Sequence, residues 1–257
     1  MRDDKHIGAL YRAPPKRLPL PPGRLALFLD VDGTLAPIVA RPHLTRIPLQ
    51  TRRSLLALQE HGVAVAALSG RPVTQVRRLL HPVDIPMGGS HGAQISLDCE
   101  RGIQFIARAP ADMVSLLRIG VDHLPGVWLE SKPAAFAIHW RQAPHQRAAV
   151  VRLVSEALAR APGWQLVEGH CVHELRRAGR DKGWALKHLM RQPAFAGRWP
   201  LAIGDDRTDE DAFAAALALG GAAIRIGATR ETLAPWQLPN VPTLAQWLRV
   251  QAQAMAV

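Results

Sequence analysis

Short apolar runs recur along the chain, and each ends in a polar cluster that is followed by an amphipathic segment. Runs of this kind are typical of buried strands in a parallel sheet, and apolar residues at helical spacing predict the helices between them. The strands are expected at 24–30, 63–69, 201–204 and 222–226, and the helices at 51–61, 72–80, 181–190, 208–219 and 243–252. This rhythm predicts an α/β fold built on a parallel sheet.

The middle of the chain has a different pattern. From about residue 108 the expected order is α-β-β-α-β-β, with helices at 112–124 and 144–160 and strands at 127–132, 135–141, 164–168 and 171–175. This order describes a self-contained α+β unit inserted into the first fold. We therefore divide the chain into a proline-rich N-terminal arm (1–23), the first part of a core (24–107), an inserted cap domain (108–176) and the second part of the core (177–257).

Two stretches, one in the arm and one in the core, contain prolines or glycines that restrict their backbone structure. The five prolines of the arm exclude a regular helix or a central strand, so the arm either packs on the surface or is disordered. The glycine-rich stretch 88–93 predicts a close approach of the backbone to a ligand or a neighbouring strand, and 94–99 with 103–107 predicts a β-hairpin.

Composition narrows the class of protein. Hydrophobic residues make up 48% of 257 residues, and no apolar run reaches the length of a membrane span or a secretory signal. Cys99 and Cys171 lie far apart and follow no metal-ligand spacing, so we expect reduced thiols in a cytoplasmic protein. The net charge of +11 is spread along the chain with few aromatic residues, which disfavours nucleic-acid binding and favours a small anionic substrate such as a phosphate ester.

The polar clusters at three strand ends carry the candidate chemistry. They contain Asp30 and Asp32 after the first strand, Ser69 and Arg71 after the second, and the acids Asp205, Asp206 and Asp209 after the third. If the strands are parallel neighbours, these ends meet in one crevice. Two carboxylates one residue apart repel each other unless a cation lies between them, and a hard divalent cation is the natural partner.

Simpler explanations exist for most of these residues. An Asp-Gly turn explains Asp32 but not Asp30. A helix cap explains Ser69 nearly as well as phosphate binding does. A favourable position for acids at a helix N-terminus explains Asp206. For Asp209, this explanation and a role in the metal site have about equal weight.

The motifs D-V-D-G-T-L, S-G-R, Lys182-Gly183 and G-D-D-R-T-D-E-D resemble, in this order, the four motifs of the haloacid dehalogenase (HAD) superfamily of phosphatases. The resemblance implies a Rossmann-like three-layer core with Asp30 as nucleophile and Asp32 as general acid and base. It also implies that Ser69 and Lys182 bind phosphate and balance charge. Mg²⁺ is expected on Asp30, Asp205 and the Asp32 backbone carbonyl, with Asp206 or Asp209 as a further ligand or support.

The inserted unit is similar to the cap of the trehalose-6-phosphate phosphatase family. Glu130-Ser131-Lys132, His139-Trp140-Arg141, the stretch 88–93 and Glu174-Leu175-Arg176 carry this likeness, while Gln94 and Arg177 depart from the family pattern. It implies that Glu130, Lys132 and Glu174 bind the sugar. His139 and Arg141 remain open between substrate contact and cap architecture, Arg71 between phosphate binding and pinning its loop, and Trp128 between sugar stacking and packing.

Strand alternation gives the cap prediction a second basis. Glu130 and Lys132 fall on one face of their strand, and His139 and Arg141 fall opposite the apolar residues of theirs. We expect the apolar faces to meet the cap helices and the polar face to be free to close over the core. Cross-strand ion pairs on a solvated sheet are the alternative.

Together these features predict a Mg²⁺-dependent phosphatase that converts trehalose 6-phosphate to trehalose and phosphate through an aspartyl-phosphate. The alternatives are a sucrose- or glucosylglycerol-phosphate phosphatase of the same architecture and a non-catalytic regulatory subunit that binds sugar phosphates. A functional link to a trehalose-6-phosphate synthase is expected, and neither a nucleic acid nor a membrane is expected as a partner.

Overall fold

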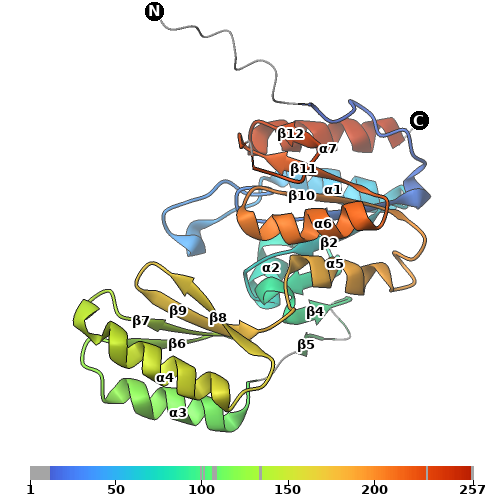
Figure 1. Ribbon diagram of the computed structural model, residues 1–257. Coiled ribbons are helices and arrows are strands. Elements are labelled where there is room, and N and C mark those ends of the chain that lie inside the picture. The colour runs from blue at the N-terminus through green and yellow to red at the C-terminus, as the bar shows by residue number, and fades with distance from the viewer. Residues whose placement is uncertain are drawn as a thin grey trace, which may run out of the picture. The chain divides into compact units, whose positions relative to one another are not determined.

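The computed structural model describes residues 12–98, 100, 102–105, 109–132, 135–229 and 231–255. The chain divides into two compact units: one comprises residues 1–104 and 181–257, and the other comprises residues 105–180 (Figure 1). Cys99 and part of the proline-rich arm lie outside the described residues. No helix among the described residues is both long enough and apolar enough to cross a membrane.

The first unit, which we call the core, is an α/β sandwich around an eight-stranded sheet in the order β12-β11-β10-β1-β2-β3-β4-β5. The pairs from β12 to β3 are parallel, and β4 joins β3 antiparallel. Its strands are β1 (Leu25–Leu29), β2 (Ala64–Leu68), β3 (Met87–Gly89), β4 (Gln94–Ser96), β5 (Gln104–Phe105), β10 (Trp199–Gly204), β11 (Ala222–Ile226) and β12 (Trp236–Leu238). Its helices are α1 (Leu49–Glu60), α2 (Val73–Leu80), α5 (Lys182–Met190), α6 (Glu210–Ala218) and α7 (Val241–Met255).

Both faces of this sheet are covered by helices, as Figure 1 shows, with α1 packed against α7 and α5 packed against α6. Every residue of β1 and β2 is buried, because a parallel sheet with helices on both sides leaves neither face to water. Alternate residues of β1 serve different faces. Leu27 lies in the hydrophobic cluster shared with α1 and α7, and the Phe28 ring lies 5.4 Å from the Phe195 ring.

Glycines in β3 let neighbouring backbone and side chains approach closely. A Cβ on Gly88 would lie 2.9 Å from the Ala185 Cβ, and one on Gly89 would lie 2.7 Å from the Val73 backbone nitrogen. The first two glycines of the glycine-rich stretch therefore lie in a strand packed against α5 and the start of α2, and Ser90–Gly92 form a 3-10 turn after it. The buried Gln94 side chain accepts a hydrogen bond from that same Val73 N–H at 2.9 Å.

The second unit, which we call the cap unit, is an antiparallel sheet in the order β6-β7-β9-β8 with two helices. Its elements are α3 (Ala111–Asp122), β6 (Trp128–Lys132), β7 (Ala135–His139), α4 (Arg147–Ala159), β8 (Trp164–Gly169) and β9 (Val172–Arg177), which is the predicted α-β-β-α-β-β order. The strand expected over 135–141 ends at His139. It ends there because the chain turns after Trp140, whose carbonyl accepts from the Ala143 N–H at 2.9 Å.

The described part of the proline-rich arm packs on the core. The Gln251 side chain, buried on α7, accepts from the Leu18 N–H at 2.9 Å and donates to the Lys16 carbonyl at 2.7 Å. The indole N–H of Trp247 donates to the Pro15 carbonyl at 2.9 Å. The prolines prevent this segment from forming a helix or joining a sheet. Its backbone groups instead form hydrogen bonds with side chains of α7.

Gln251→Ala should destabilise the protein by about 1–3 kcal/mol, because it leaves the buried Leu18 N–H without its partner. Gln253→Ala, on the same helix but exposed, is the matched control and should change stability by less than about 0.5 kcal/mol. The measurement is urea unfolding followed by circular dichroism. Equal midpoints for the two variants would contradict this role of Gln251.

Candidate active site

The carboxyl end of β1 places the first acids in the middle of the core sheet. β1 lies between β10 and β2, so residues that follow these three strands share one edge of the sheet. The Asp30 N–H donates to the Ile203 carbonyl at 2.9 Å, which extends the β1–β10 ladder to the start of the site. The Asp30 side chain is 6% exposed.

A buried lysine joins this acid to a second one. The Lys182 ammonium donates to Asp30 Oδ1 and to Asp209 Oδ1, both at 2.7 Å. Lys182 is the first residue of α5, whose N-terminus is capped by the Asp181 side chain accepting from the Trp184 N–H at 2.6 Å. The cap of α5 therefore fixes where the ammonium enters the site.

Burial controls the protonation of these acids. Burial raises the pKa of Asp30 to about 6 against the opposing effect of Lys182, and burial together with the charge of Asp30 raises the pKa of Asp209 to about 7. The pKa of Asp205 rises to about 6 through burial and the neighbouring charges of Asp209 and Asp206. Burial by itself would lower the pKa of Lys182, but the charges of Asp30 and Asp209 outweigh it and raise the pKa. The site thus holds more negative charge than its ammonium balances.

Three of these acids form a group with the chemistry of a metal site. Asp30, Asp205 and Asp209 each offer a carboxylate oxygen, and these oxygens lie within 4.8 Å of one another. Oxygen ligands and excess negative charge suit a hard divalent cation such as Mg²⁺. Gly33 borders the group with φ of +82°, and a Cβ there would lie 2.0 Å from Asp205 Oδ2. Only glycine gives this backbone conformation and leaves the Asp205 carboxylate its space.

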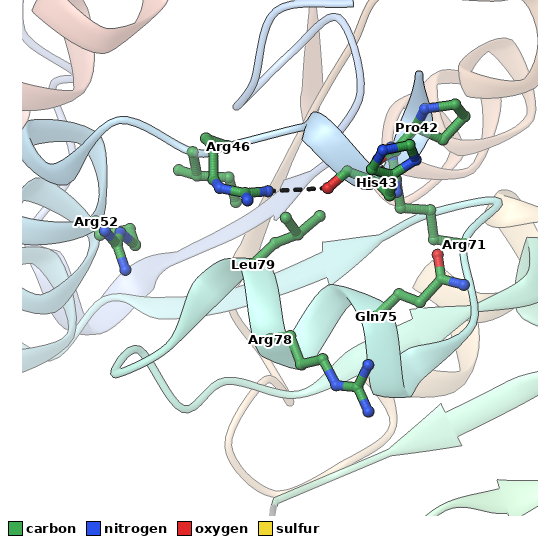
Figure 2. A pocket seen from close by; sticks show the side chains of 9 residues that line it. Pro42, His43, Arg46, Arg52, Arg71, Gln75, Arg78 and Leu79 are labelled. Carbon is green, nitrogen blue, oxygen red and sulfur yellow. Dashed lines mark hydrogen bonds between the residues drawn. The ribbon is translucent and has the colours of Figure 1, made fainter. Parts of the chain in front are cut away.

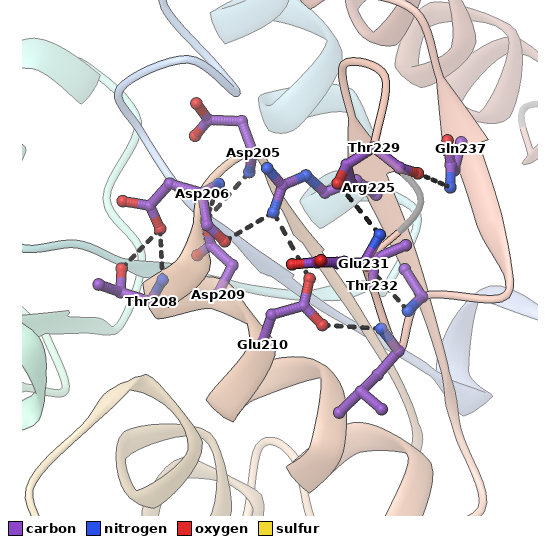
Figure 3. Close-up of polar contacts among 12 residues, drawn as sticks. Asp205, Asp206, Thr208, Asp209, Glu210, Arg225, Thr229, Glu231, Thr232 and Gln237 are labelled. Carbon is purple, nitrogen blue, oxygen red and sulfur yellow. Dashed lines mark hydrogen bonds and ion pairs between the residues drawn. The ribbon is translucent and has the colours of Figure 1, made fainter.

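The other two candidate ligands have carboxylates engaged elsewhere. Asp206 accepts from the Thr208 N–H at 2.8 Å and from the Thr208 hydroxyl at 2.7 Å, as Figure 3 shows. Burial by itself would raise the pKa of Asp206, but these hydrogen bonds and the charge of Lys182 outweigh it and lower the pKa. Its carboxylate therefore caps the turn before α6 and lies outside the group of three. The Asp32 carboxylate also lies outside that group.

Asp209 contacts other residues of the site, whereas its sequence position did not decide between this and an ordinary acid at a helix N-terminus. Its Oδ2 accepts from the backbone N–H groups of Asp205 and Asp206, both at 3.0 Å, while its Oδ1 holds Lys182. Because both oxygens are bonded, Asp209 fixes the turn that carries Asp205 as well as the ammonium. A Cβ on Gly204 would lie 2.1 Å from the Asp209 Cγ, so this close packing needs glycine there.

Arg225 supports the same turn from β11. Its guanidinium donates to the Asp206 carbonyl at 2.8 Å and lies 3.5 Å from Glu210 Oε1, and Glu210 in turn accepts from the Leu233 N–H at 2.8 Å (Figure 3). Arg225 was not predicted from the sequence, because a single arginine in a strand gives no sign that it binds a turn and is most simply explained as exposed to solvent.

Arg71 binds Asp32 and pins a loop. Its Nε and Nη2 donate to the two Asp32 carboxylate oxygens at 2.5 and 2.6 Å, a bidentate ion pair. The same guanidinium donates to the Thr45 hydroxyl at 2.8 Å and the Pro42 carbonyl at 3.0 Å. The hydrogen bond and charge of Asp32 raise the pKa of Arg71. Arg71 therefore fixes both the Asp32 carboxylate and the segment that follows β1.

Ser69 follows β2 and is buried beside these groups. Its hydroxyl accepts from the Arg71 N–H at 3.1 Å, as a turn or cap residue does, and keeps its own O–H to donate. Ser69 lines a cavity of about 430 Å³ together with the candidate catalytic residues Asp30, Asp32, Lys182, Asp205 and Asp206. His91, with φ of +52°, also lines it and was not singled out from the sequence.

The cap unit brings four of the predicted sugar-binding residues onto one sheet face. Lys132 pairs with Glu174 at 2.5 Å, and His139 Nε2 lies 3.0 Å from Glu130 Oε2. The Trp128 ring stacks on His139 with centroids 3.9 Å apart. Leu129, Phe136 and Leu175 pack in the hydrophobic cluster with α3 and α4 on the other face. Arg141 lies in the exposed turn after β7, so strand alternation does not assign it to this face.

Comparisons with a family model, with related sequences and with solved structures all point to the same family. The trehalose-phosphatase family model matches residues 28–242. The chain is 36% identical over 236 residues to the trehalose-6-phosphate phosphatase of Escherichia coli, covering 90% of this chain and 88% of that one. It is 39% identical over 207 residues to a probable trehalose-phosphate phosphatase of Sinorhizobium fredii, covering 79% and 77%. The C-terminal domain of Candida albicans trehalose-6-phosphate phosphatase has a similar fold, with a TM-score of 0.70 at 21% identity over 96% and 99% of the two chains.

The raised pKa values predict how stability depends on pH in metal-free protein. Unfolded aspartates titrate near pH 4, whereas Asp30, Asp205 and Asp209 titrate at about 6 to 7. Between those values the folded state binds more protons than the unfolded state, so these groups make the free energy of unfolding fall as pH rises.

Asp209→Asn removes one such group and should flatten this fall. The measurement is urea unfolding in EDTA across that pH range, and the difference between wild type and variant cancels groups elsewhere. Parallel stability curves for the two proteins would show that Asp209 titrates normally.

Proposed function

The chain belongs to the trehalose-phosphatase family, and we propose that this phosphatase hydrolyses trehalose 6-phosphate to trehalose and phosphate. The observation that carries the proposal is the buried Asp30–Lys182–Asp209 group at the end of β1, with Asp205 beside it. It supplies a carboxylate fixed in place, a cation beside it, and oxygen ligands for a metal.

In the first step, a carboxylate oxygen of Asp30 attacks phosphorus and the bond from phosphorus to the sugar oxygen breaks. Asp32 gives its proton to that oxygen as it leaves, which releases trehalose and forms an aspartyl-phosphate on Asp30. Asp32 lines the same cavity as Asp30, and Arg71 orients its carboxylate. Because Arg71 binds both oxygens, one of them has to leave this contact before Asp32 can carry the proton.

In the second step, a water attacks phosphorus and the bond to Asp30 breaks. Asp32, now a carboxylate, takes the proton of that water, so both residues return to their starting states. The Ser69 hydroxyl would donate to a phosphate oxygen, and Lys182 would balance the charge between phosphate and Asp30. Both residues line the same cavity as Asp30.

Asp30, Asp205 and the Asp32 backbone carbonyl would hold Mg²⁺, with Asp209 positioning both Asp205 and Lys182. When bound, the ion supplies positive charge to the phosphoryl oxygens, which otherwise face an anionic nucleophile. Asp206, whose carboxylate caps the following turn, would support this site through its backbone.

Glu130, Lys132 and Glu174 would bind the sugar hydroxyls. Their ion pairs sit on the helix-free face of the cap sheet, and charged groups of this kind discriminate strongly between hydroxyl patterns. His139 orients Glu130, and Arg141 is the weakest candidate because it lies in an exposed turn. A cytoplasmic location and a functional link to a synthase stay predictions.

The proposed activity is tested by phosphate release from trehalose 6-phosphate with Mg²⁺ and with EDTA, for wild type and Asp30→Asn. We expect Asp30→Asn to lower kcat by at least about 10³-fold, because the amide is a poor nucleophile. Phosphate release that survives this substitution would mean that Asp30 is not the nucleophile. A protein that binds sugar phosphates without hydrolysing them would support the regulatory-subunit alternative.

Glu174→Gln should raise KM for trehalose 6-phosphate by about tenfold and leave the rate on p-nitrophenyl phosphate within about twofold, because the latter has no sugar to bind. The matched control is Glu168→Gln, an exposed glutamate on β8. A screen of sugar phosphates completes the test. Equal rates on sucrose 6-phosphate or on many monosaccharide phosphates would contradict the trehalose assignment.

A further inference from the structure

A second cavity lies in the core, next to the one that holds the candidate catalytic residues. It has a volume of about 650 Å³, which is the size of a small-molecule site. Its walls come from the segment after β1, from α1 and from α2, as Figure 2 shows. It is lined by Pro42, His43, Arg46, Ile47, Arg52, Arg71, Gln75, Arg78 and Leu79.

The lining is rich in arginine and contains no acid. Four of the nine residues are arginines, and Arg71 is the one among them that pairs with a carboxylate. Arg46 donates to the carbonyls of His43 and Thr45 at 3.0 and 2.8 Å, and Arg52 donates to the His81 carbonyl. Backbone carbonyls orient these guanidinium groups but leave their charge uncompensated.

Arg78 is exposed on α2, and no described residue accepts a hydrogen bond from it. Arg46, Arg52 and Arg78 come from three separate segments and line one concavity, and no acid is among the residues that line it (Figure 2). An anion bound there interacts favourably with all three charges. Guanidinium groups bind phosphate oxygens in bidentate fashion, and several of them favour a ligand with several phosphates.

We propose that this cavity is a binding site for a small polyanion carrying at least two phosphate groups, beside the catalytic cavity with which it shares Pro42, Arg71 and Gln75. The arginines bind its phosphates, while Ile47, Leu79 and Pro42 give an apolar wall that an organic part can contact. This goes beyond the proposed hydrolysis, because it requires neither the catalytic acids nor the cap unit.

The test is isothermal titration calorimetry of the full chain with inorganic tripolyphosphate in EDTA. Without divalent metal, the excess negative charge around Asp30 and Asp205 disfavours a polyanion in the catalytic cavity, so binding reports on the arginine-lined one. We expect one equivalent to bind with Kd below about 0.1 mM. ATP serves as a second probe: tighter binding than tripolyphosphate identifies a nucleoside polyphosphate, and equal binding identifies the phosphates alone as the feature bound.

Arg46→Gln and Arg78→Gln should each weaken tripolyphosphate binding by about tenfold, because each removes a charge-assisted contact. Arg53→Gln is the matched control. It removes the same charge from α1 at an exposed position outside the cavity, and should weaken binding by less than about twofold.

Three results would overturn the proposal: no binding of either probe, an equal loss in Arg53→Gln, or a rise in KM for the sugar phosphate in Arg78→Gln without any polyanion present. The last would make the cavity part of the substrate site. Because binding is measured without substrate, its failure is distinguishable from a failure of the proposed phosphatase reaction.

Discussion

The ammonium of Lys182 is the interaction on which the rest of the site depends. The Lys182 side chain is 3% exposed and lies between two carboxylates. Removing the ammonium from water costs free energy, and both ion pairs are needed to offset that cost. Those contacts join the end of β1, the start of α5 and the turn before α6. Asp30 and Lys182 are separated by 152 positions, because the whole cap unit is inserted between them. One buried charge thus links the two parts of the core that the insertion divides in sequence.

Two cations pair with three acids and leave Asp205 without a cation partner among the described ion pairs, and this division sets their chemistry. Lys182 serves Asp30 and Asp209 in a buried environment that, with Asp205 beside it, leaves excess negative charge. Arg71 serves Asp32 alone, at a position where the carboxylate is 35% exposed. The first arrangement favours a divalent cation, because raised pKa values mean that ionisation is costly until positive charge arrives. The second leaves a carboxylate that solvent can reach, which the proton exchange proposed for Asp32 requires.

Most of the fold, and which strand ends meet at the candidate site, could be predicted from the sequence for a physical reason. Apolar runs that end in polar clusters specify buried strands and the edge where their ends meet, which is why Asp30, Ser69 and Asp205 were expected to lie together, as they do in one cavity. Arg71 and Asp209 were left with alternatives, because an arginine after a strand and an acid before a helix suit a loop contact or a cap equally well. Which of these forms depends on contacts across 39 and 27 positions, which no local pattern records. The early end of β7 at His139 is set by the turn that follows, in which the Ala143 N–H donates to the Trp140 carbonyl, and apolar alternation up to Arg141 does not reveal that turn.

The charged pairs of the cap sheet differ from the Lys182 contacts in how strongly they are buried. The residues of β7 that lie opposite Lys132 and Glu130 are Ala135 and Ala137, and Ala137 also faces Glu174, so small side chains leave room for long charged ones. The resulting pairs are partly exposed, with Lys132 and Glu174 at 36% and 23%, and pairs of this kind contribute about 0–1 kcal/mol to stability. They hold each other in place at little energetic cost. The proposed sugar binding fits this arrangement, because a ligand hydroxyl can replace one partner without unfolding the sheet. The Lys182 contacts cannot be exchanged in this way, because the ammonium and both carboxylates are buried. On this proposal, different charges of the chain supply specificity and stability.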